Sequence, residues 1–165
     1  MAGLMVLGTA SNAGKSAMVA ALLRIYANRG YRVAPFKAQN MALNSGITDD
    51  GSEIGRAQIV QAEAARIPAD VRMNPILLKP TAPGVSQVIV DGRVYKNLET
   101  RAYYAEEKKL FPKALAAYES LAHEFDFVLC EGAGSASEIN LKSVDMVNMG
   151  FAKAADIPAI LIADI

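Results

Sequence analysis

The first part of the chain alternates short apolar runs with one stretch of helical periodicity. Residues 3–7 form an apolar run long enough for a buried strand, and residues 31–36 form a second one. Between them, from residue 15 to 29, apolar side chains recur every four residues, which is typical of one helix face, and Gly30 follows where a helix C-cap belongs. The pattern predicts strand, loop, helix and strand, and such a unit implies parallel strands joined by a right-handed crossover.

The middle of the chain has shorter and more mixed elements. Residues 37–52 are polar, rich in turn-forming residues and too long for a simple connection, which favours a functional loop. Asp91-Gly92 between two apolar segments indicates a type I′ hairpin. Pro112 should break or kink the helix predicted around it. The elements expected here are a helix at 54–66, a strand at 75–79, hairpin strands at 88–90 and 93–95, and a helix at 98–124.

The end of the chain adds two apolar strands, at 125–130 and 159–163, with a helix expected at 144–155. Strands that alternate with helices predict an α/β fold, an open, mostly parallel β-sheet flanked by helices. We expect the strand at 159–163 to be buried. A parallel strand normally leads into another crossover, so we expect residues 1–165 to form a single domain that is truncated at its C-terminal end.

Composition narrows the class of protein. The chain has 17 Lys and Arg against 17 Asp and Glu, so its net charge gives no indication of binding to nucleic acid or to an anionic membrane. A single Cys excludes an intrachain disulfide framework and a multi-cysteine metal site. No apolar run approaches the roughly 18 residues of a membrane span, and the N-terminus lacks the basic region of a signal peptide. We therefore expect a soluble cytoplasmic domain.

The connection between the first strand and the first helix has the features of a phosphate-binding loop. Such a position aims backbone N–H groups and a helix N-terminus at anionic oxygens. Lys15 would reach the β- and γ-phosphates of ATP, and the Ser16 hydroxyl would ligate Mg²⁺. Five residues separate Gly8 from Gly14, one more than in the standard pattern, and the alternative is a glycine-rich turn with a chance Gly-Lys-Ser. The predicted nucleotide-binding residues are Gly8, Thr9, Asn12, Ala13, Gly14, Lys15 and Ser16.

Two charged residues are expected at the same edge of the sheet. Glu131 follows an apolar strand, and ligands of open α/β sheets bind at the carboxyl ends of the strands. A buried carboxylate needs a cation or hydrogen-bond donors, and Mg²⁺ bound to ATP would serve. Lys37 ends the second strand, where a second cation would neutralise a transferring phosphoryl group. The alternatives are a Glu that caps a turn and a solvated lysine. A second Mg²⁺ ligand stays open among Asp49, Asp50 and Glu53.

A nucleophilic pair of Cys130 and His123 is a weaker hypothesis. Cys130 lies inside an apolar strand, and burial would raise the pKa of its thiol and hide the sulfur.

Four segments together resemble one family. They are residues 8–16, residues 36–45 (FKAQNMALNS), residues 51–58 (GSEIGRAQ), and residues 131–135 (EGAGS) with 138–141 (EINL). In this order they resemble the N-terminal ATP-binding domain of the cobyric acid synthase family, glutamine-dependent amidases of cobalamin biosynthesis. That family is related to dethiobiotin synthetase, whose phosphate loop has the same extra residue. The resemblance covers essentially the whole chain and implies a P-loop NTPase fold of the dethiobiotin synthetase type.

The resemblance also implies an activity and its residues. ATP would phosphorylate a peripheral carboxylate of adenosylcobyrinic acid diamide, and ammonia would convert the acyl phosphate to an amide. Ser16, Glu53 and Glu131 would be Mg²⁺ ligands, and Lys15 and Lys37 would be catalytic by holding the γ-phosphate. The positions implied to face the corrinoid substrate are Gln39, Asn40, Asn44 and Asn140.

Further domains and partners follow from the same resemblance. Members of the family continue into a glutaminase domain that releases ammonia, and the only Cys of this chain, Cys130, cannot serve as its nucleophile. We expect ammonia to come from a glutaminase domain outside this chain. No nucleic acid or membrane partner is expected, and a homodimer is left open.

Two other functions are possible for a phosphate loop of this kind. A dethiobiotin synthetase would carboxylate a diamine, and the Gln39-Asn40-Met41 segment argues against it. A nucleotide switch of the chromosome-partitioning kind carries an additional lysine five positions before the loop lysine, where this chain has Ala10.

Overall fold

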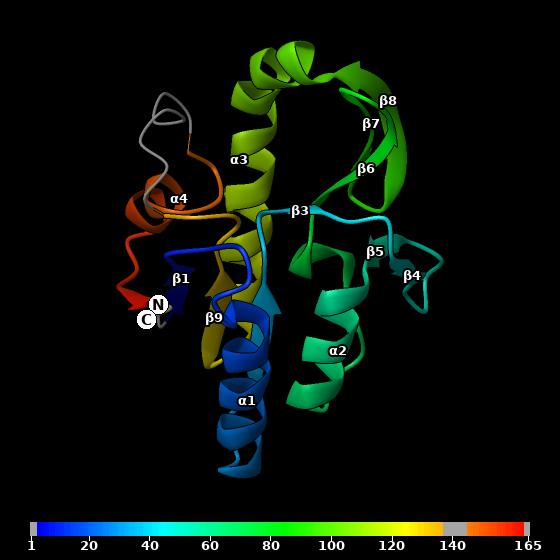
Figure 1. Cartoon of the computed structure of the whole chain (residues 1–165). Coiled ribbons are helices and arrows are strands. Elements are labelled where there is room, and N and C mark those ends of the chain that lie inside the picture. Colours follow the sequence, from blue (N-terminus) through cyan, green and yellow to red (C-terminus); the bar gives the residue numbers. More distant parts are fainter. Residues whose placement is uncertain (1–2, 137–144, 164–165) are drawn as a thin grey trace.

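Four apolar segments pair side by side in a parallel sheet, in the order β10-β1-β9-β2 (Figure 1). The computed structural model describes residues 3–136 and 145–163. The strands are β1 (Gly3–Gly8), β2 (Val33–Phe36), β9 (Phe127–Glu131) and β10 (Ala159–Ile162). Met5 on β1 lies opposite both Cys130 on β9 and Ala159 on β10. All of these pairings are parallel, so the predicted sheet is confirmed and the carboxyl ends of its strands share one edge.

Helices cover this sheet on both faces because its strand residues are apolar on both sides. On one face Val6 and Leu129 pack with Val19 and Leu23 of α1 (Lys15–Asn28). The opposite face packs against α3 (Thr100–Glu124) and α4 (Met149–Ala154). Its centre is an aromatic cluster in which the rings of Phe36 and Phe151 lie 5.2 Å apart, with Tyr118 edge-on to both.

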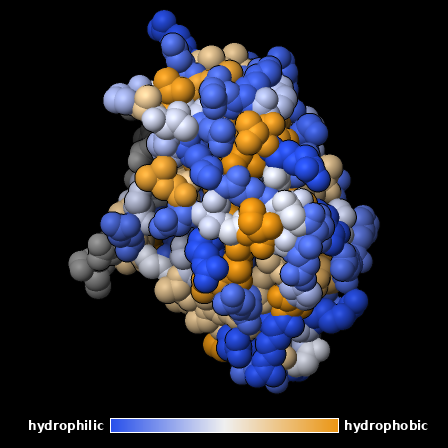
Figure 2. All heavy atoms as spheres, turned by 90° about the vertical axis from the view of Figure 1, so that its right-hand side faces the viewer, coloured by the Kyte–Doolittle hydropathy of each residue, from blue (hydrophilic) through white to orange (hydrophobic). Residues whose placement is uncertain are grey.

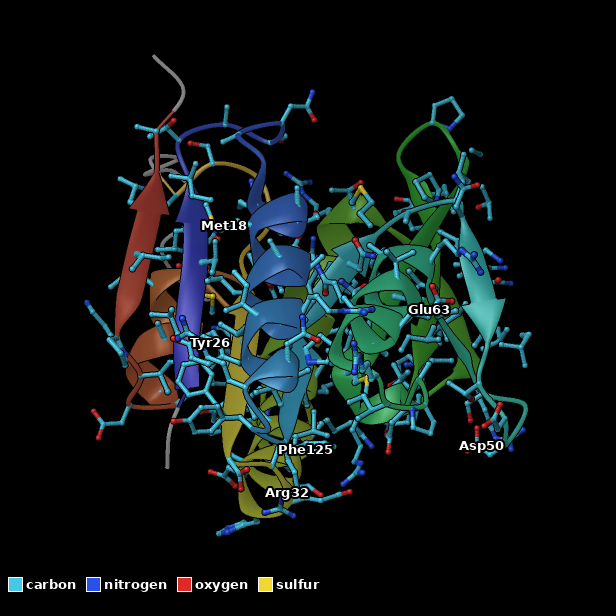
Figure 3. All side chains as sticks on the ribbon, turned by 90° about the horizontal axis from the view of Figure 1, so that it is seen from below. Met18, Tyr26, Arg32, Asp50, Glu63 and Phe125 are labelled. Carbon is cyan, nitrogen blue, oxygen red and sulfur yellow. The ribbon has the colours of Figure 1, made fainter. Side chains whose placement is uncertain are left out.

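Helix α2 (Arg56–Ala65) lies beside α1. The Arg24 guanidinium of α1 donates hydrogen bonds to the carbonyl oxygens of Glu63 and Ala64 at the end of α2, at 3.0 and 2.7 Å. Figure 3 shows these two helices side by side, with Glu63 labelled on α2 and Met18 and Tyr26 on α1. The contact holds the end of α2 against α1.

A second, mixed sheet extends from the first in the order β3-β6-β7-β8. Its strands are β3 (Gln39–Met41), β6 (Ile76–Ala82), β7 (Val85–Val90) and β8 (Arg93–Glu99). A further antiparallel pair joins β4 (Ser45–Ile47) to β5 (Glu53–Gly55), and a short 3-10 helix covers Val71–Met73. Asp91 and Gly92 both have positive φ, 49° and 76°, which confirms the type I′ turn between β7 and β8.

Three expectations about local structure need correction. Residues 37–52 are not one loop, because Gln39–Met41 pairs with β6 and Ser45–Ile47 pairs with β5. At Pro112 the expected break is wrong, because α3 is continuous through it and buried residues on either side, such as Leu110 and Ala114, hold both halves on the core. The alternative expectation, a kink, stays a prediction.

Strand β10 is the third correction. It forms as expected but is largely exposed, with Leu161 59% exposed, because it lies at the edge of the sheet. The helix expected at 144–155 is confirmed only for Met149–Ala154, and residue 144 lies outside the described residues.

One cavity of the described structure lies away from the predicted site. It has a volume of about 540 Å³ and is lined by residues such as Tyr31, Arg32 and Phe125. Figure 3 shows Arg32 and Phe125 together near the amino end of β2, at the opposite end of the strands from the phosphate loop. None of the predicted site residues lines this cavity.

The face formed by α2 and the second sheet has hydrophobic side chains interspersed among hydrophilic ones (Figure 2). Among the described residues, no helix is both long enough and apolar enough to span a bilayer.

Candidate nucleotide-binding site

The predicted phosphate loop connects β1 to α1 at the carboxyl edge of the parallel sheet. The Thr9 amide donates to the Ile162 carbonyl of β10 at 3.0 Å, and the Ala13 amide donates to the Ala10 carbonyl at 3.3 Å. Gly14 precedes α1 with φ 89°, a left-handed conformation that costs glycine least. The loop therefore turns directly into the helix, whose first N–H groups have no acceptor within the helix.

A second loop, residues 132–136, lies against the phosphate loop. The Ala136 amide donates to the Gly8 carbonyl at 2.9 Å, and the Ser135 hydroxyl donates to the Thr9 carbonyl at 2.7 Å. Asn148 holds this loop from the other side, since its side chain exchanges two hydrogen bonds with the backbone of Ala133. A Cβ at Gly132 would meet Asn148 Oδ1 at 2.4 Å, so the close approach requires glycine.

Lys15 lies over the phosphate loop and is 4% exposed. Its Nζ donates to the carbonyl oxygens of Ala10, Ser11 and Gly134 at 2.7, 3.2 and 2.9 Å. Burial lowers the pKa of Lys15, and the positive charge of Lys37 lowers it further, while the charge of Glu131 opposes both effects. The ammonium is therefore held at the loop by neutral carbonyl groups that phosphate oxygens can replace.

Glu131 is the centre of the site and is 2% exposed. Its Oε1 accepts from the Ser16 hydroxyl at 2.8 Å and from Lys37 Nζ at 2.6 Å. Its Oε2 accepts from Gln61 Nε2 of α2 at 2.6 Å. Lys37 is itself 9% exposed, so the two charges form a buried ion pair. Three predicted site residues, Ser16, Lys37 and Glu131, thus meet although they come from different parts of the chain.

The set of oxygen donors fits a magnesium ion. Mg²⁺ binds proteins through one or two hard oxygen ligands and takes the rest from water and phosphate. The Ser16 hydroxyl and the Glu131 carboxylate are ligands of that kind, and they are hydrogen-bonded to each other. Among the residues that the structure describes, no three His, Cys, Asp or Glu side chains cluster as a metal site would require. Ser16 and Glu131 therefore suit a metal that arrives with a nucleotide.

The structure places Glu53 in another contact. Its carboxylate accepts from Lys79 Nζ at 2.7 Å and from the Ser45 hydroxyl at 2.5 Å. Burial pushes the pKa of Glu53 up, but the hydrogen bonds from Lys79 and Ser45 outweigh it and hold the pKa below its usual range. Glu53 is not a hydrogen-bond partner of Ser16 or Glu131 in the described structure, and its role as a metal ligand stays a prediction. Asp50 is exposed in the β4–β5 turn (Figure 3).

The residues implied to face the substrate have different surroundings. The Tyr103 hydroxyl donates to Gln39 Oε1 at 2.5 Å, and Asn40 Nδ2 donates to Gln58 Oε1 at 3.1 Å. The exposed Asn44 accepts from the Arg56 amide through its backbone carbonyl. Asn140 lies outside the described residues.

Cys130 and His123 do not form a pair. Cys130 is completely buried in β9, and this burial raises the pKa of its thiol, whereas His123 is exposed in the last turn of α3.

The sequence did not single out Gln58, Gln61, Tyr103 and Asn148, which the structure brings to the site. The only local signal was that Gln58 and Gln61 are polar side chains spaced by three residues in an otherwise alanine-rich helix.

Comparison with known proteins agrees with this geometry. Residues 4–163 match the family model described as the CobQ/CobB/MinD/ParA nucleotide binding domain. The chain is 59% identical over 162 residues to a cobyric acid synthase of Limosilactobacillus reuteri and, over the same length, to one of Ruminiclostridium cellulolyticum. It is 56% identical over 161 residues to one of Salmonella heidelberg. Each alignment covers 98% of this chain and 32% of the relative, so the chain spans about a third of the length of these curated relatives.

Proposed function

The chain belongs to the CobQ/CobB/MinD/ParA nucleotide-binding domain family, and from that membership we propose that it is the ATP-binding synthetase domain of a cobyric acid synthase. The proposed reaction is the ATP-dependent amidation of peripheral carboxylates of adenosylcobyrinic acid diamide. Similarity to cobyric acid synthases along nearly the whole chain favours this function over dethiobiotin synthesis and over a partitioning switch.

The observation that carries the proposal is the convergence of Ser16 and Lys37 on Glu131, beside the loop that holds Lys15. Phosphoryl transfer depends mainly on positioning and on neutralising charge. Two lysines and a carboxylate at the carboxyl edge of a parallel sheet supply both.

In the proposed first step a substrate carboxylate oxygen attacks the γ-phosphorus of ATP, and the bond to the β-phosphate oxygen breaks. The products are an acyl phosphate and ADP. A carboxylate is a poor nucleophile toward an anion, so Lys15 and Lys37 would move from their present acceptors to the γ-phosphate oxygens as charge shifts there. In the second step ammonia attacks the acyl carbon, and inorganic phosphate leaves as the amide forms.

We propose that Ser16 and Glu131 hold Mg²⁺, with Glu53 as a further ligand. Mg²⁺ held there would neutralise negative charge on the phosphates of ATP. The backbone of residues 8–16 would bind the phosphates of ATP, with contributions from Gly8, Thr9, Asn12, Ala13 and Gly14. Gln39, Asn40, Asn44 and Asn140 would contact the corrinoid.

We also propose that ammonia comes from a glutaminase domain beyond these residues. The length of the relatives supports this, because two thirds of each lies outside the alignment. A cytoplasmic location fits a chain whose single cysteine is free and buried.

The test is Lys15→Ala in the full-length enzyme, assayed for ADP formation that depends on the corrinoid diamide, with ammonium chloride as the nitrogen source. We expect turnover to fall by on the order of 10²–10³-fold, the usual cost of losing one group that stabilises a transition state. Lys153→Ala, on the exposed side of α4, is the matched control and should be unaffected.

Two results would overturn the proposal. Turnover of Lys15→Ala close to that of the unmodified enzyme would remove the loop lysine from the reaction. ADP formation at the same rate with and without the corrinoid diamide would refute the proposed substrate.

A further inference from the structure

Three buried side-chain amides connect β3 to the centre of the site. Asn40 Nδ2 donates to Gln58 Oε1 at 3.1 Å, and Gln58 Nε2 donates to Gln61 Oε1 at 3.4 Å. Gln61 Nε2 then donates to Glu131 Oε2 at 2.6 Å. Asn40, Gln58 and Gln61 are 8%, 0% and 1% exposed. Every donor in this amide relay points toward Glu131.

The direction of the relay follows from the chemistry of its inner end. A carboxylate only accepts hydrogen bonds, so Gln61 must turn its NH₂ group to Glu131. Its carbonyl oxygen then faces Gln58, which must in turn offer its own NH₂ group. The same requirement passes to Asn40, which must turn its NH₂ group toward Gln58 Oε1. Glu131 therefore fixes the orientation of all three amides.

The backbone beside the relay leaves just enough room for the hydrogen bond between Asn40 and Gln58. A Cβ at Gly55 would lie 2.5 Å from Asn40 Nδ2 and 2.8 Å from Gln58 Oε1, so only glycine permits these two amides to meet. Asn74 Oδ1 accepts from the Gly55 amide at 3.2 Å and holds the backbone there.

The outer end of the relay is an acceptor. Asn40 Oδ1 has no hydrogen-bond partner among the residues that the structure describes, although the side chain is more than nine-tenths buried. Asn40 Oδ1 is also not among the fully buried polar atoms that lack a partner, so it is open to solvent or to a ligand. A carboxylate placed there would meet a carbonyl oxygen and be repelled, whereas an N–H group would be bound.

We propose that Asn40 is a specificity residue that accepts a hydrogen bond from an N–H donor, either a primary carboxamide of the substrate or ammonia. Gln58 and Gln61 are positioning residues that transmit its orientation from Glu131. The identity of the substrate in this inference rests on the proposed function, but the relay itself does not. The inference narrows the role implied by the family resemblance, in which Asn40 would face the corrinoid substrate.

The first experiment tests the relay without the corrinoid. Asp at position 40 has no N–H, so Gln58 must rotate its amide to donate to residue 40. Gln61 must then rotate to donate to Gln58, which places the Gln61 carbonyl oxygen against Glu131. In Asn40→Asp we expect the Mg²⁺ concentration for half-maximal binding of a fluorescent ATP analogue to rise about tenfold, as for losing a hydrogen bond to a charged group. A negative charge acting only through space would lower that concentration. The two explanations therefore predict opposite signs.

A double variant identifies the route. Gln61→Met alone should raise the Mg²⁺ requirement, and Asn40→Asp added to it should raise it no further, because the relay is already cut. Asn97→Asp on the exposed strand β8 introduces the same charge away from the site and should leave the Mg²⁺ requirement unchanged. Tighter Mg²⁺ binding in Asn40→Asp, or additive effects in the double variant, would overturn the relay.

The second experiment tests the donor with the full-length enzyme. Asn40→Leu removes the outer acceptor while Glu131 still orients Gln58 and Gln61. We expect a rise of about tenfold in one KM, with kcat and the Mg²⁺ requirement changing little. A raised KM for the corrinoid diamide identifies a carboxamide, and a raised KM for ammonium identifies ammonia. If neither KM rises, Asn40 does not bind an N–H donor.

The two experiments fail separately. If the protein lacks amidation activity but Asn40→Asp raises its Mg²⁺ requirement, the proposed function is refuted and the relay is retained. If the enzyme is active but the effects of Asn40→Asp and Gln61→Met on the Mg²⁺ requirement are additive, the relay is refuted and the proposed function is retained.

Discussion

The buried pair of Lys37 and Glu131 makes a specific prediction about stability. Lys37 Nζ lies 2.6 Å from Glu131 Oε1, with side-chain exposures of 11% and 1%. Removing one partner of such a pair leaves a buried charge without compensation, at a cost of about 3–5 kcal/mol. The cost should be greatest for Glu131→Gln, because Glu131 also opposes the positive charge of the nearby Lys15.

Lys37→Met should cost less. Glu131 keeps its hydrogen bonds from Ser16 and Gln61 in that variant, so mainly one charge-assisted hydrogen bond is lost, worth about 1.5–3 kcal/mol. The double variant should cost less than the sum of the two single changes by at least about 1 kcal/mol, since neither charge is then left alone.

Thermal and denaturant unfolding of the four proteins measure these effects. A loss of 1 kcal/mol lowers Tm by about 2–4 °C in a chain of this size, so Glu131→Gln should lose roughly 10 °C. The matched control is Lys113→Met, which breaks an exposed pair with Asp91 and should change stability by less than about 0.5 kcal/mol. The reasoning is refuted if Glu131→Gln unfolds like the unmodified protein or if the double variant equals the sum of the single changes.

Two further predictions concern buried groups outside the site. Burial, with a smaller contribution from Asp145, raises the pKa of Glu107 to about 7, so the folded chain keeps a proton that the unfolded chain gives up near 4.5. The stability contributed at Glu107 should therefore fall as pH rises from 4.5 to 7. A plot of Tm against pH should be flatter over that range for Glu107→Gln than for the unmodified protein. Parallel plots for the two proteins would contradict this. Cys130 should react with iodoacetamide only in the unfolded protein, because it is fully buried and burial raises the pKa of its thiol; mass spectrometry that finds labelling under native conditions would contradict it.

The phosphate loop and Glu131 were predictable because local sequence defines them. A strand, a glycine-rich turn and a helix occur in succession around Lys15, and Glu131 ends an apolar strand. Parallel pairing then brings both to one edge without any further information. The same reasoning placed Lys37 there, since β2 is the neighbour of β9.

The amide relay was not predictable from the sequence. Gln61 and Glu131 are 70 residues apart, and a hydrogen bond between them leaves no spacing pattern. Glu53 illustrates the same limit, because its ion-pair partner Lys79 comes from a different strand, 26 residues later. Strand β3 of the second sheet was missed because it has only three residues, too few to show an alternating pattern.

The connection between the two sheets has a mechanical consequence. Strand β2 ends at Phe36 in the parallel sheet, and β3 begins at Gln39 in the second sheet, so Lys37 lies in a two-residue joint between them. The Lys37 amide donates to the Met73 carbonyl, and the Lys37 carbonyl accepts from the Asn74 side chain, just before β6 begins. These hydrogen bonds hold both ends of the Lys37 peptide unit in place. A displacement of the second sheet relative to the parallel sheet would therefore move the backbone at Lys37. Because Lys37 Nζ donates to Glu131 Oε1, a force on the hairpin of β7 and β8 would reach the site through this residue.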